Sequence, residues 1–207
     1  MTTTARNTNS IVFDLIALTK PRVNFLIIFT AIVGMLLAQD YSLNYYLMLY
    51  ASIGIYLAAS AAAVINHIVD QKIDAIMDRT KSRPLIRGNV TTNHAIYFSI
   101  FISSLSTYIL FQYVNTITTI LTLFSIIVYS IIYSVYLKNL TSQNIVIGGI
   151  AGAMPPLLGW TAMTNGVSEL PLLLFLIIFL WTPPHFWALA VYKPVSYTHL
   201  TLPTSHN

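Results

Sequence analysis

A regular run of carboxylates is the feature of this 207-residue sequence that most directly points to chemistry. One amide and three carboxylates recur at every fourth position, as Asn66, Asp70, Asp74 and Asp78. On a helix, this spacing places the side chains along one face, where the carboxylates repel one another unless a cation lies between them. Mg²⁺ takes oxygen ligands of this kind and completes its shell with water and substrate phosphate. The run therefore predicts a magnesium site formed by Asn66, Asp70 and Asp74.

Cationic side chains follow the carboxylates directly, as Arg79, Lys81 and Arg83. Arg binds phosphate oxygens bidentately and Lys binds them as a point charge, so this segment can hold a diphosphate. Pro84 is expected to end the helix, because proline biases the residue before it toward an extended backbone. The alternative interpretation is a helix end with solvated charges. Half of the six acidic residues fall between positions 70 and 78, which favours a metal–diphosphate site.

The rest of the sequence consists mostly of apolar runs. Charged residues make up 8% of the chain, against about 25% in soluble domains. Six runs are long enough to cross a membrane, at residues 23–39, 43–65, 94–113, 117–137, 145–163 and 170–192. The run at 11–20 is too short and predicts an interfacial helix. The expected fold is therefore all-α, a polytopic membrane helix bundle. The absence of cysteine excludes disulfides, cysteine-bound metal clusters and a thiol nucleophile.

The basic residues orient this bundle. All ten Lys and Arg residues fall in segments that six spans place on one side, whereas Asp40 and Glu169 fall on the other. The positive-inside rule then puts both chain ends and the 66–93 loop in the cytoplasm. Because topology accounts for the net charge of +4, the sequence gives no reason to expect nucleic acid as a partner.

The sequence divides into three segments. Residues 1–20 are expected to form a cytoplasmic N-terminus with the short interfacial helix, and residues 21–193 the membrane domain. Residues 194–207 are a polar tail of a different character, which fits either a natural tail or a truncated chain that ends in foreign sequence.

Two local patterns concern helix packing. The proline pairs at 155–156 and 183–184 are expected to break the last two spans and free backbone carbonyls. Four glycines lie in the fifth span, as Gly148, Gly149, Gly152 and Gly159. Small residues at this spacing predict close approach between helices.

Several motifs resemble the intramembrane prenyltransferases of the ubiquinone-biosynthesis type. The carboxylate run, followed by Arg-Thr-x-x-Arg-Pro-Leu, is similar to the first aspartate motif of that family. Further motifs resemble its haem-prenylating branch, the protoheme IX farnesyltransferases or haem O synthases. They are Thr-Lys-Pro-Arg at 19–22, Tyr-Ser-Val-Tyr-Leu-Lys at 133–138, the Gly- and Pro-rich run at 148–160, and Trp-Thr-Pro-Pro-His-Phe-Trp-Ala at 181–188. The resemblance covers about residues 15–193.

The resemblance implies a reaction and a larger protein. The reaction would transfer the farnesyl group of farnesyl diphosphate to a vinyl group of haem b, giving haem O for terminal oxidases. Mg²⁺ is the implied cofactor, and haem b is a substrate. The implied partners are the two substrates, the lipid bilayer of a bacterial inner membrane, and haem A synthase or oxidase assembly proteins. The family has about nine helices and a second acidic motif beyond the sixth, so this chain is expected to be an inactive fragment.

The resemblance also implies how residues of this chain would act. Cleavage of the allylic carbon–oxygen bond leaves a farnesyl cation and a diphosphate anion, which Mg²⁺ on Asn66, Asp70 and Asp74 would stabilise. The side chains expected to hold the diphosphate are Arg79, Lys81, Arg83, Lys138 and Tyr133. The carboxylates, with Arg79, Arg83 and His185, form the expected catalytic set.

Three aromatic side chains are candidates for contact with haem. His185 is ionisable and lies within a span, where such groups are usually functional, and it would serve as an iron ligand or a proton acceptor. Trp187 belongs to the same motif. His67 follows Asn66 and points about 100° away from the metal face of a helix, so a surface position is equally open.

Two other functions remain open. A sibling prenyltransferase would use an aromatic quinone precursor as acceptor, and the motif at 181–188 argues for haem instead. A cation transporter would use Asp70 and Asp74 as an ion site. Transporters usually place such groups near the middle of the membrane, whereas these lie at the cytoplasmic end of a span.

Overall fold

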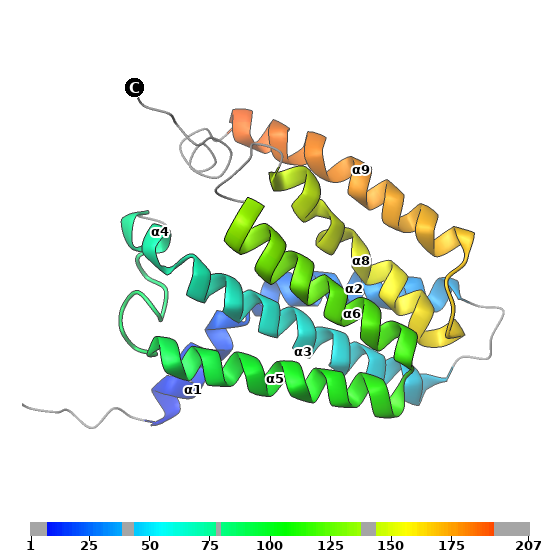
Figure 1. Cartoon of the computed structure of the whole chain (residues 1–207), viewed down its shortest axis with the longest axis horizontal. Helices are drawn as coiled ribbons and strands as arrows, with labels where there is room; N and C mark the ends of the chain where they lie inside the picture. Colours follow the sequence, from blue (N-terminus) through cyan, green and yellow to red (C-terminus); the bar gives the residue numbers. More distant parts are fainter. Residues whose placement is uncertain (1–7, 39–43, 78–79, 138–143, 193–207) are drawn as a thin grey trace, which may run out of the picture.

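The chain folds into a bundle of helices (Figure 1). The computed structural model describes residues 8–38, 44–77, 80–137 and 144–192. Its elements are α1 (Thr8–Leu18), α2 (Pro21–Leu37), α3 (Tyr45–Val69), α4 (Gln71–Ile76), α5 (Thr92–Tyr113), α6 (Thr116–Ile127), the π-helix η1 (Val128–Leu137), α8 (Asn144–Thr164) and α9 (Glu169–Tyr192). Every regular element within the described ranges is helical, which confirms the expected all-α class. The N-terminal residues 1–7 and the polar tail at 194–207 lie outside these ranges.

The expected membrane spans are present as long apolar helices. Five helical stretches are long and apolar enough to cross a membrane, and α1 and α2 together form a sixth candidate that is bent by 48°. The bend falls where Lys20 adopts a left-handed backbone with φ of 52° and Pro21 begins α2. The separate short helix expected at 11–20 is therefore α1, and the first span, expected at 23–39, is observed as α2, which ends at Leu37.

Two buried clusters hold the bundle together. The first joins α2, α3, α5 and α8, through residues such as Met35, Ile55, Leu110 and Leu158. The second joins α1, α3 and α5 to the loop between α4 and α5, and it includes Leu18, Val64, Leu85, Val90 and Ile102. Leu85 and Val90 are 4% and 1% exposed. This loop is therefore anchored on the bundle by burial of its apolar side chains.

Glycines bring α2 and α8 into backbone contact. A Cβ atom added at Gly34 would overlap the carbonyl oxygen of Pro156, and one added at Gly159 would overlap that of Ala31. At Gly148 an added Cβ would lie 2.5 Å from the ring of Tyr133. The prediction of close helix packing is confirmed at Gly148 and Gly159, whereas an added Cβ at Gly152 would meet nothing within 4 Å.

The prediction that the proline pairs break their helices is wrong. α8 continues through Pro155 and Pro156, and α9 continues through Pro183 and Pro184. A proline removes one hydrogen bond to the carbonyl four residues earlier, but packing against neighbouring helices keeps such a helix intact in a membrane protein. The close contact between Pro156 and Gly34 is packing of this kind.

The α2–α8 contact yields a prediction about stability. Gly159→Ala should lower the thermal midpoint in detergent, since the new methyl group overlaps the Ala31 carbonyl and overpacking typically costs about 1–3 kcal/mol. Gly152→Ala is the matched control, because an added Cβ there meets nothing within 4 Å and helix propensity favours alanine by about 1 kcal/mol. Equal midpoints for the two variants would contradict the close contact.

Candidate active site

The carboxylates lie at a junction between two helices rather than along one. α3 ends at Val69, and Asp70 connects it to α4, which contains Asp74. The backbone hydrogen bonds continue across the junction: Asp70 N–H donates to the Asn66 carbonyl at 2.9 Å, and Asp74 N–H donates to the Asp70 carbonyl at 2.8 Å. The predicted four-residue spacing therefore keeps its hydrogen-bonded register from Asn66 to Asp74.

The helical face expected to continue to Asp78 and to Pro84 ends earlier. α4 stops at Ile76, and Met77 has an extended backbone with ψ of 125°. Thr80 completes this end, because its hydroxyl donates to the Asp74 carbonyl oxygen at 2.8 Å. Asp78 and the predicted diphosphate ligand Arg79 lie outside the described residues.

Asn66 connects three elements around the first carboxylate. Its amide nitrogen donates to Oδ2 of Asp70 at 3.1 Å and to Oγ of Ser134, in η1, at 3.1 Å. Its amide oxygen accepts a hydrogen bond from Nζ of Lys20, at the start of α2, at 3.0 Å. Asn66 is buried, as is Asp70. The amide oxygen that was predicted to bind a metal therefore contacts a cation of the protein itself.

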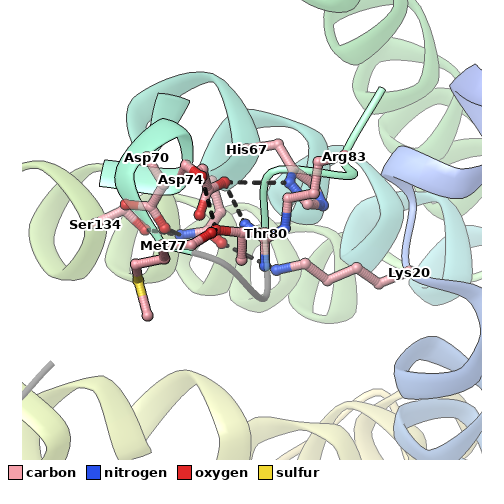
Figure 2. A network of polar contacts seen from close by, with 9 residues as sticks. Lys20, His67, Asp70, Asp74, Met77, Thr80, Arg83 and Ser134 are labelled. Atoms are coloured by element: carbon pink, nitrogen blue, oxygen red, sulfur yellow. Dashed lines mark hydrogen bonds and ion pairs between the residues drawn. The ribbon is translucent and has the colours of Figure 1, made fainter. Parts of the chain in front are cut away.

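Asp74 is neutralised by the loop that follows α4. Its carboxylate Oδ2 forms an ion pair with Nη1 of Arg83 (Figure 2). Asp74 is 4% exposed, and a buried carboxylate is strongly disfavoured without such a partner. The burial of Leu85 and Val90 holds Arg83 in this position. Asp74, predicted as a metal ligand, and Arg83, predicted as a diphosphate ligand, therefore contact each other directly.

His67 lies beside the second carboxylate rather than at the surface. It is 5% exposed, and its Nδ1 is 3.9 Å from Oδ2 of Asp74. Neither ring nitrogen has a hydrogen-bond partner among the described residues. The surface alternative is therefore wrong. His67 and Asp74 are seven positions apart, which is close to two helical turns, so the drift of about 40° at each four-residue step brings Asp74 toward the side of His67.

Lys20, Asn66, Asp70, Asp74, Arg83 and Ser134 together form what we call the carboxylate network. A cavity of about 510 Å³ lies next to this network. Lys20, which contacts Asn66, also lines the cavity, together with Asn24, Tyr129 and Tyr133. The remaining lining comes mainly from small and apolar residues of α2, α3, α6, α8 and α9. The volume falls within the range of about 300–1,000 Å³ that is typical of small-molecule sites. Lys20 is the charged residue of this mostly apolar lining, so the cavity adjoins the carboxylates at the end marked by Lys20, which we call its head.

The other predicted site residues are distributed unevenly. Tyr133 is part of the cavity wall, against Gly148, and Lys81 is exposed on the loop. Lys138 lies outside the described residues. His185 stacks on Trp181 with ring centroids 4.2 Å apart, and it is half-buried. Trp187 is 52% exposed.

Residues that the sequence analysis did not assign to the site include Lys20, Thr80 and Ser134. The position of Lys20 at the site could have been predicted, because a cation directly before the proline that begins a span lies at the membrane surface. The roles of Thr80 and Ser134 could not have been predicted, since hydroxyl side chains are common along this chain. His185 is not brought to the carboxylate network by any contact among the described residues, although Thr182 and Phe186 of the same helix line the cavity.

The fold and site define a membrane helix bundle in which buried carboxylates lie close to an apolar cavity, with Lys20 belonging to both. Residues 27–201 match the UbiA prenyltransferase family, and the chain belongs to this family.

Individual relatives are similar over most of the chain. It is 52% identical over 197 residues to a protoheme IX farnesyltransferase of Vesicomyosocius okutanii, covering 93% of this chain and 66% of that protein. It is 51% identical over 190 residues to a protoheme IX farnesyltransferase of Hahella chejuensis, covering 92% and 64%. The chain thus spans slightly less than two thirds of the length of these relatives.

A solved structure shares the fold. It comes from work on a digeranylgeranylglyceryl phosphate synthase in membranes, and it superposes with a TM-score of 0.72 at 22% sequence identity. The match covers 82% of this chain and 59% of the other.

Proposed function

We propose that this chain carries the diphosphate site of an enzyme that transfers the farnesyl group of farnesyl diphosphate to a vinyl group of haem b, giving haem O. The observation that carries the proposal is the position of Lys20, which belongs both to the carboxylate network and to the cavity lining. A diphosphate bound at the network would place its prenyl tail directly in the apolar space. The names of the relatives, which are protoheme IX farnesyltransferases, support haem b as the acceptor.

Mg²⁺ fits the donor groups at the head of the cavity. No group of three His, Cys, Asp or Glu side chains is arranged to hold a metal within the described ranges. Mg²⁺ needs only one or two carboxylates when phosphate and water complete its shell, and Asp70 and Asp74 supply two. When bound there, it would stabilise the charge on the departing diphosphate. Asn66 would orient Asp70 through the hydrogen bond that it already donates.

The remaining chemistry is a substitution at the allylic carbon. The carbon–oxygen bond breaks, and its electron pair leaves with the diphosphate, which Arg83 and Lys20 would bind through charge-assisted hydrogen bonds. The vinyl group of haem then attacks the farnesyl cation, water adds to the resulting cation, and a proton is released. The apolar lining would keep water from the farnesyl cation before this attack.

We further propose that the head of the cavity faces the cytoplasm of a bacterium. This orientation is supported by the ten basic residues that the span count places on one side. Haem A synthase and oxidase assembly proteins are the proposed protein partners, since they would receive the product.

Substitution of the carboxylates tests the site. Asp70→Asn and Asp74→Asn should each reduce formation of prenylated haem by at least about 100-fold, because each removes a carboxylate that would hold the Mg²⁺ that stabilises the leaving group. The assay incubates membranes with Mg²⁺, farnesyl diphosphate and haem b, and separates products by chromatography. It is run on the full-length relative of Vesicomyosocius okutanii with the matching substitutions.

Asp14→Asn is the matched control, since it removes a carboxylate of α1 that lies outside the network. It should leave turnover unchanged. Normal turnover in either network variant would refute the metal site, and prenylation of a quinone precursor in place of haem b would identify the sibling enzyme.

His185 tests the acceptor side. If it contacts haem, His185→Ala should change the visible spectrum of bound haem and weaken haem binding, with farnesyl diphosphate binding nearly unchanged. The stacking of His185 on Trp181 makes Trp181→Phe a useful companion, because it alters the ring contact but keeps the imidazole. An unchanged spectrum and unchanged activity in His185→Ala would assign this residue to packing alone.

The proposed orientation can be tested cleanly because the chain has no cysteine. Ser82 and Ser168 are both exposed, and they lie in loops at opposite ends of the bundle. In intact cells, a membrane-impermeant maleimide should label Ser168→Cys and leave Ser82→Cys unlabelled until the membrane is permeabilised. The reverse pattern would invert the proposed topology.

A further inference from the structure

The cavity runs along the helices, from the carboxylate network toward the middle of the bundle. On α3 its lining extends from Ala63 to Ile55, and on α8 it extends from Gly148 to Leu158. At 1.5 Å per residue, these stretches correspond to depths of about 12 and 15 Å. α3 runs toward the carboxylate network and α8 runs away from it. Ile55 and Leu158 therefore lie at the same end of the cavity, far from the network, which we call the deep end. The cavity therefore has a definite length as well as a volume.

Side-chain size changes along this length. The α3 residues that line the walls are all alanines, Ala58, Ala59, Ala62 and Ala63, and the α8 wall near the head is formed by glycines and Ala151. The deep end is formed by larger side chains, including Ile55 and Leu158. These two residues are only 2% and 3% exposed and belong to the first buried cluster. The α3 wall is thus formed by small residues, α2, η1 and α9 add larger side chains such as Leu26, Tyr129 and Phe186, and Ile55 and Leu158 lie at the deep end.

Tight contacts hold the segments of α3 and α8 that carry these two residues. On the α3 side, Leu110 of α5 fills the groove at Gly54, where an added Cβ would lie 2.5 Å from its side chain. The Ser106 hydroxyl donates to the Gly54 carbonyl at 2.7 Å. On the α8 side, the hydroxyls of Thr118 and Thr161 are 3.0 Å apart, one turn beyond Thr122 and Leu158. The deep end is therefore a packed floor.

We propose that Ile55 and Leu158 form a floor that measures the prenyl tail and thereby selects the prenyl diphosphate by chain length. The inference rests on the proposed function, because it takes the tail to lie in the cavity with its diphosphate at the network. A tail that is too long would press against a packed floor, and one that is too short would leave apolar surface unfilled. Both mismatches reduce affinity, as overpacking and cavities do in protein cores.

Two substitutions should move the preference in opposite directions. Leu158→Ala lowers the floor and should shift the affinity ratio by about tenfold toward geranylgeranyl over farnesyl diphosphate, which is the scale of small length changes in apolar pockets. Ala59→Leu adds a side chain one turn above Ile55, on the cavity-lining face, and should shift the ratio toward geranyl diphosphate by a similar factor. General destabilisation cannot produce shifts of opposite sign.

Matched controls alter the same side-chain types away from the cavity. Ile102→Ala truncates a buried aliphatic side chain in the second cluster, and Ser104→Leu adds a leucine to the exposed face of α5. Both should keep the wild-type chain-length ratio. Ala59→Leu removes no buried side chain, so it tests the chain-length preference even where Leu158→Ala folds poorly.

The experiment measures Mg²⁺-dependent binding of geranyl, farnesyl and geranylgeranyl diphosphate to the purified chain in lipid nanodiscs, with inorganic diphosphate as a probe of the head alone. The dissociation constant of inorganic diphosphate should be the same in the wild type and in every variant. If both floor variants bind the prenyl diphosphates tightly and keep the wild-type ratios of their dissociation constants, the proposed floor is wrong and the proposed function still stands. Failure of the wild type to bind any prenyl diphosphate would overturn both.

Discussion

The burial of two carboxylates at the end of an apolar bundle is the constraint on which the rest of the structure depends. Asp70 and Asp74 are 6% and 4% exposed, and a carboxylate withdrawn from water is costly unless it is paired and hydrogen-bonded. Arg83 pairs with Asp74, and Asn66 donates to Asp70 while accepting from Lys20. The bend between α1 and α2, the end of α3 and the anchored loop after α4 must therefore converge at one place.

The same constraint explains how the polar site and the apolar cavity are combined. Charges concentrated at one end leave the middle of the bundle free of them, and the helices around the cavity approach one another through glycine and alanine. Gly148 permits α8 to lie against Tyr133 at the head, whereas Gly34 and Gly159 permit backbone contact between α2 and α8 farther along. Close packing at these points leaves the alanine wall of α3 facing a space instead of a neighbouring helix.

The sequence predicted what local periodicity and length determine, and it missed what depends on distant contacts. The apolar spans and the spacing from Asn66 to Asp74 are local properties, and both are observed. The contacts of Asn66 with Lys20 and Ser134 join residues 46 and 68 positions apart, which no local pattern encodes. The helix predicted to run to Pro84 ends instead at Ile76, where the Thr80 hydroxyl donates to the Asp74 carbonyl oxygen. The break predicted at Pro155 and Pro156 does not occur, because packing of α2 against Pro156 keeps α8 continuous.

Charge balance at the head argues that metal ions would enter together with the diphosphate. Among the described groups of the network, the two carboxylates are offset by Lys20 and Arg83, so the protein itself is close to neutral there. A diphosphate bound alone would add uncompensated negative charge to a region of low dielectric constant, where such charge is strongly disfavoured. Divalent cations held by Asp70 and Asp74 would remove this excess. A site of this kind needs no preformed cage of three or more acidic ligands, and its metal affinity should rise when the substrate is present.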